Sequence, residues 1–327
     1  MVNVIIPAAG VGTRLRPHTH TAPKPLLPVA GQPILGHILD RIVGIPDLGR
    51  ICLVVGFLGE QIEAFVHEHY KLDVDFIQQS ELRGLGYAVH LALASLPGDD
   101  ALVVILGDTI LDVDFPAIAS GDEDYLGVKE VDDPRRFGVA EVADGFVQRL
   151  VEKPAVPPSH WAVVGLYGIR STRLFRDCLA QVVRLGEGAT GEIQMTDALQ
   201  MMIDHGARLR AVPVEGWYDC GKPETLLATN RHLLAKYPAR YAIEGSVVVS
   251  PVSIAPSATI ERSIIGPYVS IGERTRITEA VIKNSIIAED ARVSGCVLED
   301  SIIGAHALVE GFGRRLSVGE SSEVVLP

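Results

Sequence analysis

The chain has 327 residues, of which 47% are hydrophobic and 21% charged, a composition that favours one large domain plus a smaller one. Its formal net charge of −12, from 41 acidic and 29 basic residues, argues against nucleic acid or an anionic membrane surface as the main partner. No apolar run approaches the roughly 20 residues that a membrane helix needs.

We expect a cytoplasmic protein. Met1 runs straight into a strand-like stretch without a basic leader or a small-residue cleavage site. The cysteines are scattered and form no C-x-x-C pair, so we expect reduced, mostly buried thiols and no cysteine metal site: Cys52, Cys178, Cys220 and Cys296.

Up to about residue 238, short β-branched runs alternate with amphipathic stretches. The strand candidates are Val4–Ile6, Ile51–Val55, Asp73–Ile77, Ala101–Leu106 and Val163–Ile169. The helix candidates are Pro33–Ile42, Leu58–His69, Gly86–Ala94, Thr172–Val183 and Gln194–His205. This alternation predicts an α/β fold, with a Rossmann-like, mainly parallel sheet covered by helices on both faces. Ligands bind beyond the carboxyl ends of such strands, so the loop after the first strand is the first candidate site.

That loop carries glycine and fixed positive charge. Gly10 and Gly12 allow the backbone to approach an anion closely, and Arg14 and Lys24 add cations before Asp40, the first acidic residue of the chain. This balance suits a triphosphate. The sequence lacks the G-K-[ST] of a Walker P-loop, and it has leucine where the dinucleotide fingerprint needs a third glycine or alanine. On glycine spacing alone, a structural turn is almost as good an explanation.

From about residue 246 the pattern changes to a repeat. Four similar segments begin at intervals of 17, 16 and 16 residues: Ile254–Ala258, Ile271–Thr275, Ile287–Ala291 and Ile303–Ala307. Within each unit an aliphatic residue returns after five or six positions, a period typical of a three-sided solenoid with one short strand per side. The segment resembles the left-handed β-helix of hexapeptide-repeat proteins, while an ordinary β-rich domain is the alternative. We therefore predict three regions, at 1–238, 246–312 and a C-terminal tail at 313–327.

Two motifs in order identify a family resemblance. Gly10-x-Gly12-Thr13-Arg14-Leu15-x-Pro17, followed by Pro23-Lys24-Pro25-Leu26-Leu27-Pro28, resembles the signature of the nucleotide-sugar pyrophosphorylases, and the likeness covers about 230 residues. It is closest to the long-form glucose-1-phosphate thymidylyltransferases, which add a short hexapeptide tail. The resemblance implies that Arg14 grips the triphosphate, that Lys24 holds its phosphates in line, and that the loop binds the nucleotide through Ala8, Ala9, Gly10, Gly12 and Thr13.

The same resemblance assigns residues to the base and to a metal ion. Gln79 and the backbone of Gly84 would read the nucleotide base, since a glutamine amide both donates and accepts. Asp108, at the end of a buried strand, would contact the nucleotide and share Mg²⁺ with Asp219. The family usually has Gly-Thr-Pro after the second aspartate, and this chain has Gly221-Lys222-Pro223. Taken singly, each aspartate could instead cap a turn, and the glutamine could belong to a polar loop.

Further matches fall on the sugar side. The resemblance assigns sugar-phosphate binding to Gly138, Glu152, Lys153, Tyr167 and Glu192. Lys153 would neutralise the sugar phosphate, which makes it a catalytic candidate with Arg14 and Lys24. The alternatives are an exposed ion pair for Glu152 and Lys153 and a helix-dipole charge for Glu192.

These assignments predict direct displacement at the α-phosphorus of a nucleoside triphosphate by a sugar 1-phosphate, with release of pyrophosphate and no covalent nucleophile. Glucose 1-phosphate with dTTP is the first choice, and the Ile6-Pro7-Ala8-Ala9-Gly10 opening keeps UTP open. We expect a homo-oligomer assembled through the repeat.

Two other functions stay open. The repeat could transfer acyl groups in a bifunctional enzyme, although His306 is its only histidine. A non-catalytic regulatory relative is the other alternative, and it predicts erosion of Arg14, Lys24 and both aspartates, all of which are present.

Overall fold

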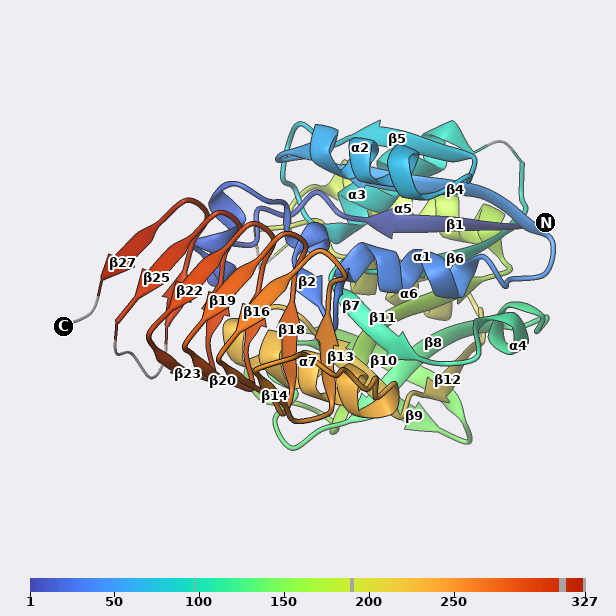
Figure 1. Ribbon diagram of the computed structural model, residues 1–327. Coiled ribbons are helices and arrows are strands. Elements are labelled where there is room, and N and C mark those ends of the chain that lie inside the picture. Colours follow the sequence, from blue (N-terminus) through green and yellow to red (C-terminus); the bar gives the residue numbers. More distant parts are fainter. Residues whose placement is uncertain (97, 189–190, 312–315, 326–327) are drawn as a thin grey trace. The chain divides into compact units, whose positions relative to one another are not determined.

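The computed structural model describes residues 1–96, 98–188, 191–311 and 316–325 (Figure 1). It divides the chain into two compact units. The first unit comprises Met1–Gly10 and Ile38–Trp217, and the second comprises Val11–His37 and Tyr218–Pro327. The segment that follows the first strand therefore belongs to the same compact unit as the C-terminal part of the chain.

The first unit is built on one mixed sheet. Over its described residues the sheet has nine strands, in the order β5 (Val74–Gln78), β4 (Leu48–Val55), β1 (Val2–Pro7), β6 (Ala101–Ile105), β11 (Trp161–Ile169), β8 (Asp124–Glu130), β12 (Leu209–Pro213), β10 (Phe146–Glu152) and β9 (Gly138–Ala143). The first four strands are mutually parallel, as predicted.

The prediction of a mainly parallel sheet is wrong for the other half. β11 runs antiparallel to both β6 and β8, and β10 runs antiparallel to β9 and β12. The physical reason is local for β9 and β10, which are joined by the two residues Asp144 and Gly145, with φ of 52° and 79°. Two consecutive positive φ angles make the tight hairpin that pairs neighbouring strands in opposite directions.

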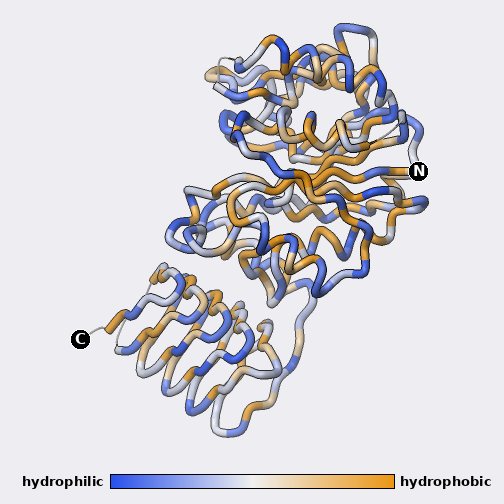
Figure 2. Tube along the Cα trace, turned by 90° about the horizontal axis from the view of Figure 1, so that it is seen from above, coloured by the Kyte–Doolittle hydropathy of each residue, from blue (hydrophilic) through white to orange (hydrophobic). Residues whose placement is uncertain are grey.

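Both faces of the sheet are covered. On one face, Ile5 and Val104 lie in a core cluster with helices α3 (Leu85–Ser95), α5 (Thr172–Leu185) and α6 (Met195–Asp204). Val4 and Ile6, which alternate with Ile5 and point to the other face, are also fully buried. Figure 2 shows the sheet strands as the most hydrophobic stretch of this unit. The remaining elements are α1 (Ile34–Ile42), which continues from the second unit into the first, α2 (Gly59–His69), α4 (Phe115–Ala119), β7 (Thr109–Asp112) and β13 (Gly216–Asp219). The five predicted helices are all present, with ends within two residues of those predicted.

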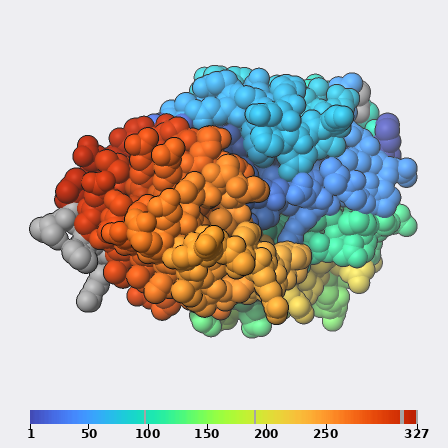
Figure 3. All heavy atoms as spheres, in the orientation of Figure 1, coloured from blue at the N-terminus to red at the C-terminus, as the bar shows by residue number. Residues whose placement is uncertain are grey.

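The second unit contains three parallel sheets that form a β-helix. The first sheet stacks β14 (Val247–Val248), β17 (Ile264–Ile265), β20 (Val281–Lys283) and β23 (Val297–Glu299). The second stacks β15 (Val252–Ile254), β18 (Val269–Ile271), β21 (Ile286–Ile287), β24 (Ile302–Ile303) and β26 (Ser317–Val318). The third stacks β16 (Thr259–Glu261), β19 (Arg276–Thr278), β22 (Arg292–Ser294), β25 (Leu308–Glu310) and β27 (Glu323–Val325). In Figure 3 the coils follow one another in chain order from orange to red.

The register of these sheets confirms the three-sided solenoid. Ile260 pairs with Ile277, which pairs with Val293, and Val293 pairs with Val309. The aliphatic residues that recur at the predicted period all lie in one buried core: Ile254, Ile260, Ile265, Ile271, Ile277, Ile282, Ile287, Val293, Leu298, Ile303 and Val309. The left hand of the β-helix remains a prediction. Parallel pairing continues with β26 and β27, while residues 313–315 and 326–327 of the predicted tail lie outside the described residues.

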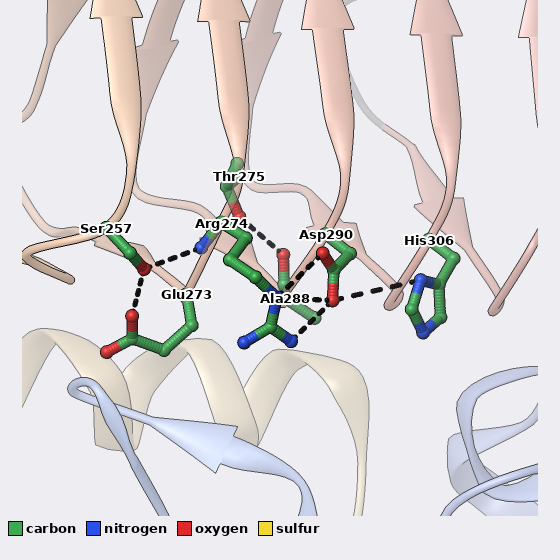
Figure 4. A network of polar contacts seen from close by, with 7 residues as sticks. All are labelled: Ser257, Glu273, Arg274, Thr275, Ala288, Asp290 and His306. Carbon is green, nitrogen blue, oxygen red and sulfur yellow. Dashed lines mark hydrogen bonds and ion pairs between the residues drawn. The ribbon is translucent and has the colours of Figure 1, made fainter.

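Polar side chains line one corner of successive coils (Figure 4). Arg274 donates two hydrogen bonds to Asp290 at 2.6 and 2.9 Å, and His306 Nδ1 lies 3.9 Å from the same carboxylate. Buried Thr275 donates to the carbonyl oxygen of Ala288 at 2.9 Å. Because these contacts join residues one coil apart, they hold neighbouring coils in register.

Val11–His37 forms short elements within the second unit. They are the 3₁₀-helices η1 (Thr13–Leu15), η2 (His18–His20) and η3 (Lys24–Leu26), and the hairpin strands β2 (Pro28–Val29) and β3 (Gln32–Pro33). Helix α7 (Pro223–Lys236) contacts both β2 and β18. Among the described residues, no helix combines the length and apolar character needed to cross a membrane.

Candidate functional site

A small cavity in the first unit collects three of the residues predicted to bind the sugar phosphate. It measures about 140 Å³ and is lined by Gly138, Glu152 and Tyr167. Gly138 of β9 pairs with Glu152 of β10. A Cβ at position 138 would lie 2.9 Å from Thr196 Cγ2 and 3.1 Å from Glu152 Oε2, so the cavity wall requires glycine here. A larger hollow of about 530 Å³ also borders Glu152 and is otherwise lined mainly by polar side chains of β10 and α6.

Lys153 joins two segments of the predicted sugar side. Its Nζ lies 3.5 Å from Glu152 Oε1 and 4.0 Å from Glu192 Oε2. Lys153 and Glu192 have side chains about half exposed, at 45% and 47%. Exposed ion pairs contribute little to stability, typically about 0–1 kcal/mol, so stability alone gives small reason to gather these three charges. An ammonium between two carboxylates can bind a phosphate while the carboxylates accept hydrogen bonds from hydroxyl groups.

Neutral side chains hold these carboxylates in place. Thr196 Oγ1 donates to Glu152 Oε2 at 3.1 Å, and Gln194 Nε2 donates to Glu192 Oε2 at 2.9 Å. Both donors are buried. The sequence alone did not assign a role to either residue, although both lie within four positions of Glu192. For the partly buried Glu152, the signal that could have found Thr196 is the general presence of hydrogen-bond donors next to a carboxylate that has lost part of its water.

The buried side chain of Tyr167 lines the same cavity and brings its phenol hydroxyl there. Burial and, secondarily, the Glu152 carboxylate raise the pKa of Tyr167 far above its ordinary value, so the hydroxyl stays neutral. Gly165 has a φ of +82°, and a Cβ there would lie 2.5 Å from Leu106 Cδ1. Glycine at 165 therefore lets β11 approach the end of β6 beside the cavity.

The predicted nucleotide residues of the first unit lie at the carboxyl ends of the parallel strands. The N–H of Gly107 donates to the carbonyl of Pro7 at 3.0 Å, and the N–H of Gln79 donates to the carbonyl of Val55 at 2.8 Å. These hydrogen bonds continue the strand pairing just beyond the carboxyl ends of the strands. As a result, five predicted nucleotide residues lie along this end of the sheet: Ala8, Ala9, Gly10, Gln79 and Asp108. Asp108 Oδ1 accepts a hydrogen bond from Thr109 Oγ1 at 3.2 Å.

The predicted base-reading loop is tied to the sugar segment. Gln79 is buried, and its Nε2 donates to the carbonyl of Glu81 at 3.0 Å, which orients the amide. Gly84 has a φ of +102°, and a Cβ there would lie 2.7 Å from the carbonyl oxygen of Ile193. The N–H of Ile193 donates to the carbonyl oxygen of Arg83 at 2.7 Å. The structure thus brings residues 79–84 together with residues 192–193, which are more than 100 positions apart.

In the second unit, Arg14 and Asp219 border the same small space. A Cβ at Gly221 would lie 2.8 Å from Asp219 Oδ1 and 3.2 Å from Arg14 Nη2. The segment before Asp219 is fixed by Tyr218, whose hydroxyl lies 2.7 Å from His232 Nε2 on α7 and whose ring stacks on that imidazole. The arrangement brings together a guanidinium and a carboxylate that are about 200 residues apart.

The predicted phosphate loop folds back on itself through Gly12. This residue has a φ of +67°, and a Cβ there would lie 3.0 Å from Thr19 Cγ2 and 3.2 Å from Lys24 Cβ. Thr19 Oγ1 donates to the carbonyl of Gly12 at 2.8 Å. Thr13 starts η1, and Lys24 is buried to 7% exposure at the start of η3. Glycine at 12 therefore lets the backbone pass directly against the lysine.

The chemistry of the predicted metal ligands fits Mg²⁺. Asp108 and Asp219 both supply hard carboxylate oxygens, and Mg²⁺ in phosphate-transfer sites commonly takes one or two carboxylates and completes its shell with phosphates and water. In the described ranges, no three His, Cys, Asp or Glu residues gather into a ready metal site. Asp108 belongs to the first unit and Asp219 to the second, and their joint binding of one ion remains a prediction.

Comparison with known proteins places this geometry in a family. Residues 3–236 match the nucleotidyl transferase family, and residues 239–293 match the GlmU-like C-terminal hexapeptide family. The chain is 34% identical to the low-salt glycan biosynthesis nucleotidyltransferase Agl11 of Haloferax volcanii, over 98% of this chain and 99% of that protein. It is also 34% identical to a glucose-1-phosphate thymidylyltransferase of Streptomyces antibioticus, over 89% and 88% of the two chains.

A solved structure shows a similar fold. A crystal structure from Bacillus anthracis, provisionally assigned as a glucose-1-phosphate thymidylyltransferase and bound to sucrose, is 27% identical with a TM-score of 0.63. The match covers 74% of this chain and 98% of that one. The chain therefore belongs to the nucleotidyl transferase family, as a sugar-1-phosphate nucleotidyltransferase that carries a GlmU-like hexapeptide segment.

Proposed function

We propose that the chain transfers a thymidylyl group from dTTP to glucose 1-phosphate and releases pyrophosphate. The observation that carries this proposal is the cavity at Gly138 and Glu152, with Lys153 between two carboxylates and the base-reading loop joined to the same segment. It supports a site that binds a phosphosugar beside a nucleotide. The name of the Streptomyces antibioticus relative favours thymidine and glucose, and UTP is the first alternative nucleotide.

The residues would act by position and charge. Glu152 and Glu192 accept hydrogen bonds from sugar hydroxyls, and Lys153 binds the sugar phosphate so that its oxygen faces the α-phosphorus. Arg14 and Lys24 neutralise the pyrophosphate as its bond to the α-phosphorus breaks. Asp108 and Asp219 would hold Mg²⁺, which when bound offsets negative charge on the triphosphate. The sugar-phosphate oxygen that attacks is already anionic, so the transfer needs no catalytic base.

Pyrophosphate release tests the proposal directly. The purified chain is assayed with dTTP, UTP, ATP and GTP, each with glucose 1-phosphate, N-acetylglucosamine 1-phosphate and mannose 1-phosphate. We expect the highest kcat/KM with dTTP and glucose 1-phosphate. Release with UTP alone would keep the reaction class and change the nucleotide, whereas no release with any pair would contradict the proposal.

A GlmU-like second activity is the alternative with a structural observation behind it. The hexapeptide match supports it, and His306 is 52% exposed with its Nδ1 3.9 Å from Asp290. Acyl transfer would need this imidazole as a base. Acetyl-coenzyme A consumption in the presence of glucosamine 1-phosphate would support the bifunctional reading, and its absence would leave nucleotidyl transfer as the sole proposed activity.

We also propose that the chain self-associates through the β-helix. Val247, Ile264, Val281 and Val297 face outward in register on the first sheet and are 55%, 42%, 40% and 43% exposed. An exposed β-branched ladder of this kind suits a second copy that presents the same surface. Light scattering of the native chain and of V281K tests this, since the variant should shift the molecular mass toward the monomer.

A further inference from the structure

The loop that is predicted to grip the triphosphate is built into the β-helix unit. Val11–His37 clusters with Tyr218–Pro327, although β1, which precedes the loop, belongs to the other unit. The contacts that hold the loop therefore come from residues 200 to 300 positions later in the chain. Two hydrogen-bonded anchors contribute to the attachment, one before Lys24 and one after it.

The first anchor lies between Arg14 and Lys24. His18 Nε2 lies 3.0 Å from Ser317 Oγ on β26. A Cβ at Gly319 would lie 3.0 Å from Pro17 Cβ, so the turn after β26 packs directly against the loop. His18 is 5% exposed, and burial lowers its pKa to about 4, which keeps the imidazole neutral near pH 7. The loop is thus fixed to the last described strand of the second β-helix sheet.

The second anchor follows Lys24 and depends on Asn230 of α7. This side chain is fully buried, and its Oδ1 accepts hydrogen bonds from Ala30 N at 2.8 Å and from Ser270 Oγ at 2.6 Å. Its Nδ2 donates to the carbonyl of Tyr268 at 3.2 Å. One amide therefore ties the tip of the β2–β3 hairpin to α7 and to strand β18.

Both anchors lie on the same side of the β-helix. Ser270 and Ser317 face outward from the second sheet, whose strand order places β18 near one edge and β26 at the other. The outward residues between them, Ile286 and Ile302, are buried to 1% and 6% exposure. This side is covered, whereas the first sheet leaves its outward ladder exposed.

The path from the anchors to the charged residues is short. His18 adjoins Thr19, whose hydroxyl holds the carbonyl of Gly12. A Cβ at Gly12 would lie 3.2 Å from Lys24 Cβ, so the backbone at Gly12 passes close to the lysine. Displacing either anchor would move the backbone on which Arg14 and Lys24 are mounted.

We infer that the β-helix is a scaffold for the triphosphate loop, with Asn230 and Ser317 as positioning residues of the transfer reaction. The inference rests on the proposed function, because it takes Arg14 and Lys24 as the groups that meet the triphosphate. A loop held before the substrate arrives loses less conformational entropy on binding, and misplacing charged groups by about 1 Å can cost up to roughly 10² in rate. The hexapeptide segment thus takes part in catalysis through the loop that it holds.

Single substitutions at each anchor test the inference. S317A removes the hydroxyl beside His18, and N230A removes all three hydrogen bonds of the Asn230 amide, to Ala30, Ser270 and Tyr268. S294A and N284A are the matched controls, since Ser294 donates to Glu310 and buried Asn284 donates to Asp300, without contact to the loop in the hydrogen bonds described for them. Initial rates give kcat and the KM of each substrate, and hydrogen exchange reports on the amides of residues 11–37.

We expect kcat to fall about fivefold in S317A, the loss typical of one hydrogen bond, and by up to roughly 10² in N230A. The KM of glucose 1-phosphate should stay within about twofold, because the predicted sugar residues all belong to the first unit. Loop amides should exchange faster in both variants and at the native rate in both controls. If losing any such hydrogen bond were enough to loosen the loop by lowering stability, the loop amides of S294A and N284A would also exchange faster than in the native protein.

The outcomes separate the two proposals. If native protein turns over and both anchor variants keep its kcat and its loop exchange, the scaffold inference is overturned and the proposed function stands. If S294A lowers kcat as much as S317A, the inference is also overturned. If no nucleotide yields pyrophosphate, the proposed function fails, while faster loop exchange in S317A and N230A still decides whether the β-helix holds the loop.

Discussion

The predicted sugar residues and the predicted triphosphate residues belong to different units of the chain and are held by different contacts. The sugar-side residues stand on β9, β10, β11 and the start of α6, where hydrogen bonds such as Thr196 to Glu152 fix them within the first unit. Arg14 and Lys24 stand on a loop that the second unit holds through Asn230 and Ser317. Substitutions in the first unit should therefore affect mainly the use of the sugar phosphate, and substitutions in the second unit mainly the use of the nucleotide.

Lys153 should give the largest effect. K153A removes the ammonium proposed to neutralise the sugar phosphate, so we expect kcat/KM for glucose 1-phosphate to fall by about 10²–10³. K283A is the control, since Lys283 is a half-exposed lysine of the β-helix that pairs with Glu299 at 2.7 Å. Steady-state kinetics of both variants provides the measurement. Near-native turnover of K153A would remove its catalytic assignment.

Gly221 tests the other half of the site. In G221A the new methyl group would meet Asp219 Oδ1 at 2.8 Å and Arg14 Nη2 at 3.2 Å, so both charged groups must shift. We expect kcat to fall by about 10², with the KM of glucose 1-phosphate within about twofold. G121A is the control, because a Cβ there meets its nearest described atom only at 3.7 Å. A large rise in the KM of the sugar phosphate would break the separation between the two halves.

Gly138 should show the opposite selectivity. A methyl group at 138 would press on Thr196 Cγ2 and Glu152 Oε2 and displace the carboxylate that faces the cavity. We expect the KM of glucose 1-phosphate to rise about tenfold, as for loss of a hydrogen bond to a charged group, with the KM of the nucleotide unchanged. Isothermal titration with each substrate measures the two affinities separately. Equal weakening of both would argue that the halves share one scaffold.

His18 should give the smallest effect, on stability. Its folded pKa of about 4 lies below the ordinary 6.5, so between these values the unfolded chain binds a proton that the folded chain does not. The free energy of unfolding should therefore fall as pH drops through this window, by roughly 1 kcal/mol at pH 5.5 relative to pH 8. Urea unfolding of native protein and H18Q at both values measures it. An equal pH dependence in H18Q would show that His18 is not responsible.

Much of the fold was readable from local sequence. The aliphatic period of the repeat predicted the three-sided solenoid, because each inward residue must reach one shared core. The first four strands and their helices also followed their patterns. The other half of the sheet did not, since β8, β9, β10 and β12 were not predicted as strands, and the β9–β10 hairpin depends on two positive φ angles at residues 144 and 145.

The sequence by itself determined the family, the repeat and the chemical types gathered at the site, because motif order and hydrophobic period are local properties of the chain. Tertiary structure alone decided that Thr196 holds Glu152, that Gln194 holds Glu192 and that the triphosphate loop is mounted on the β-helix. The His18–Ser317 contact spans 299 positions and the Ala30–Asn230 contact spans 200. Hydrogen bonds between residues so far apart arise from packing and leave no pattern in neighbouring residues.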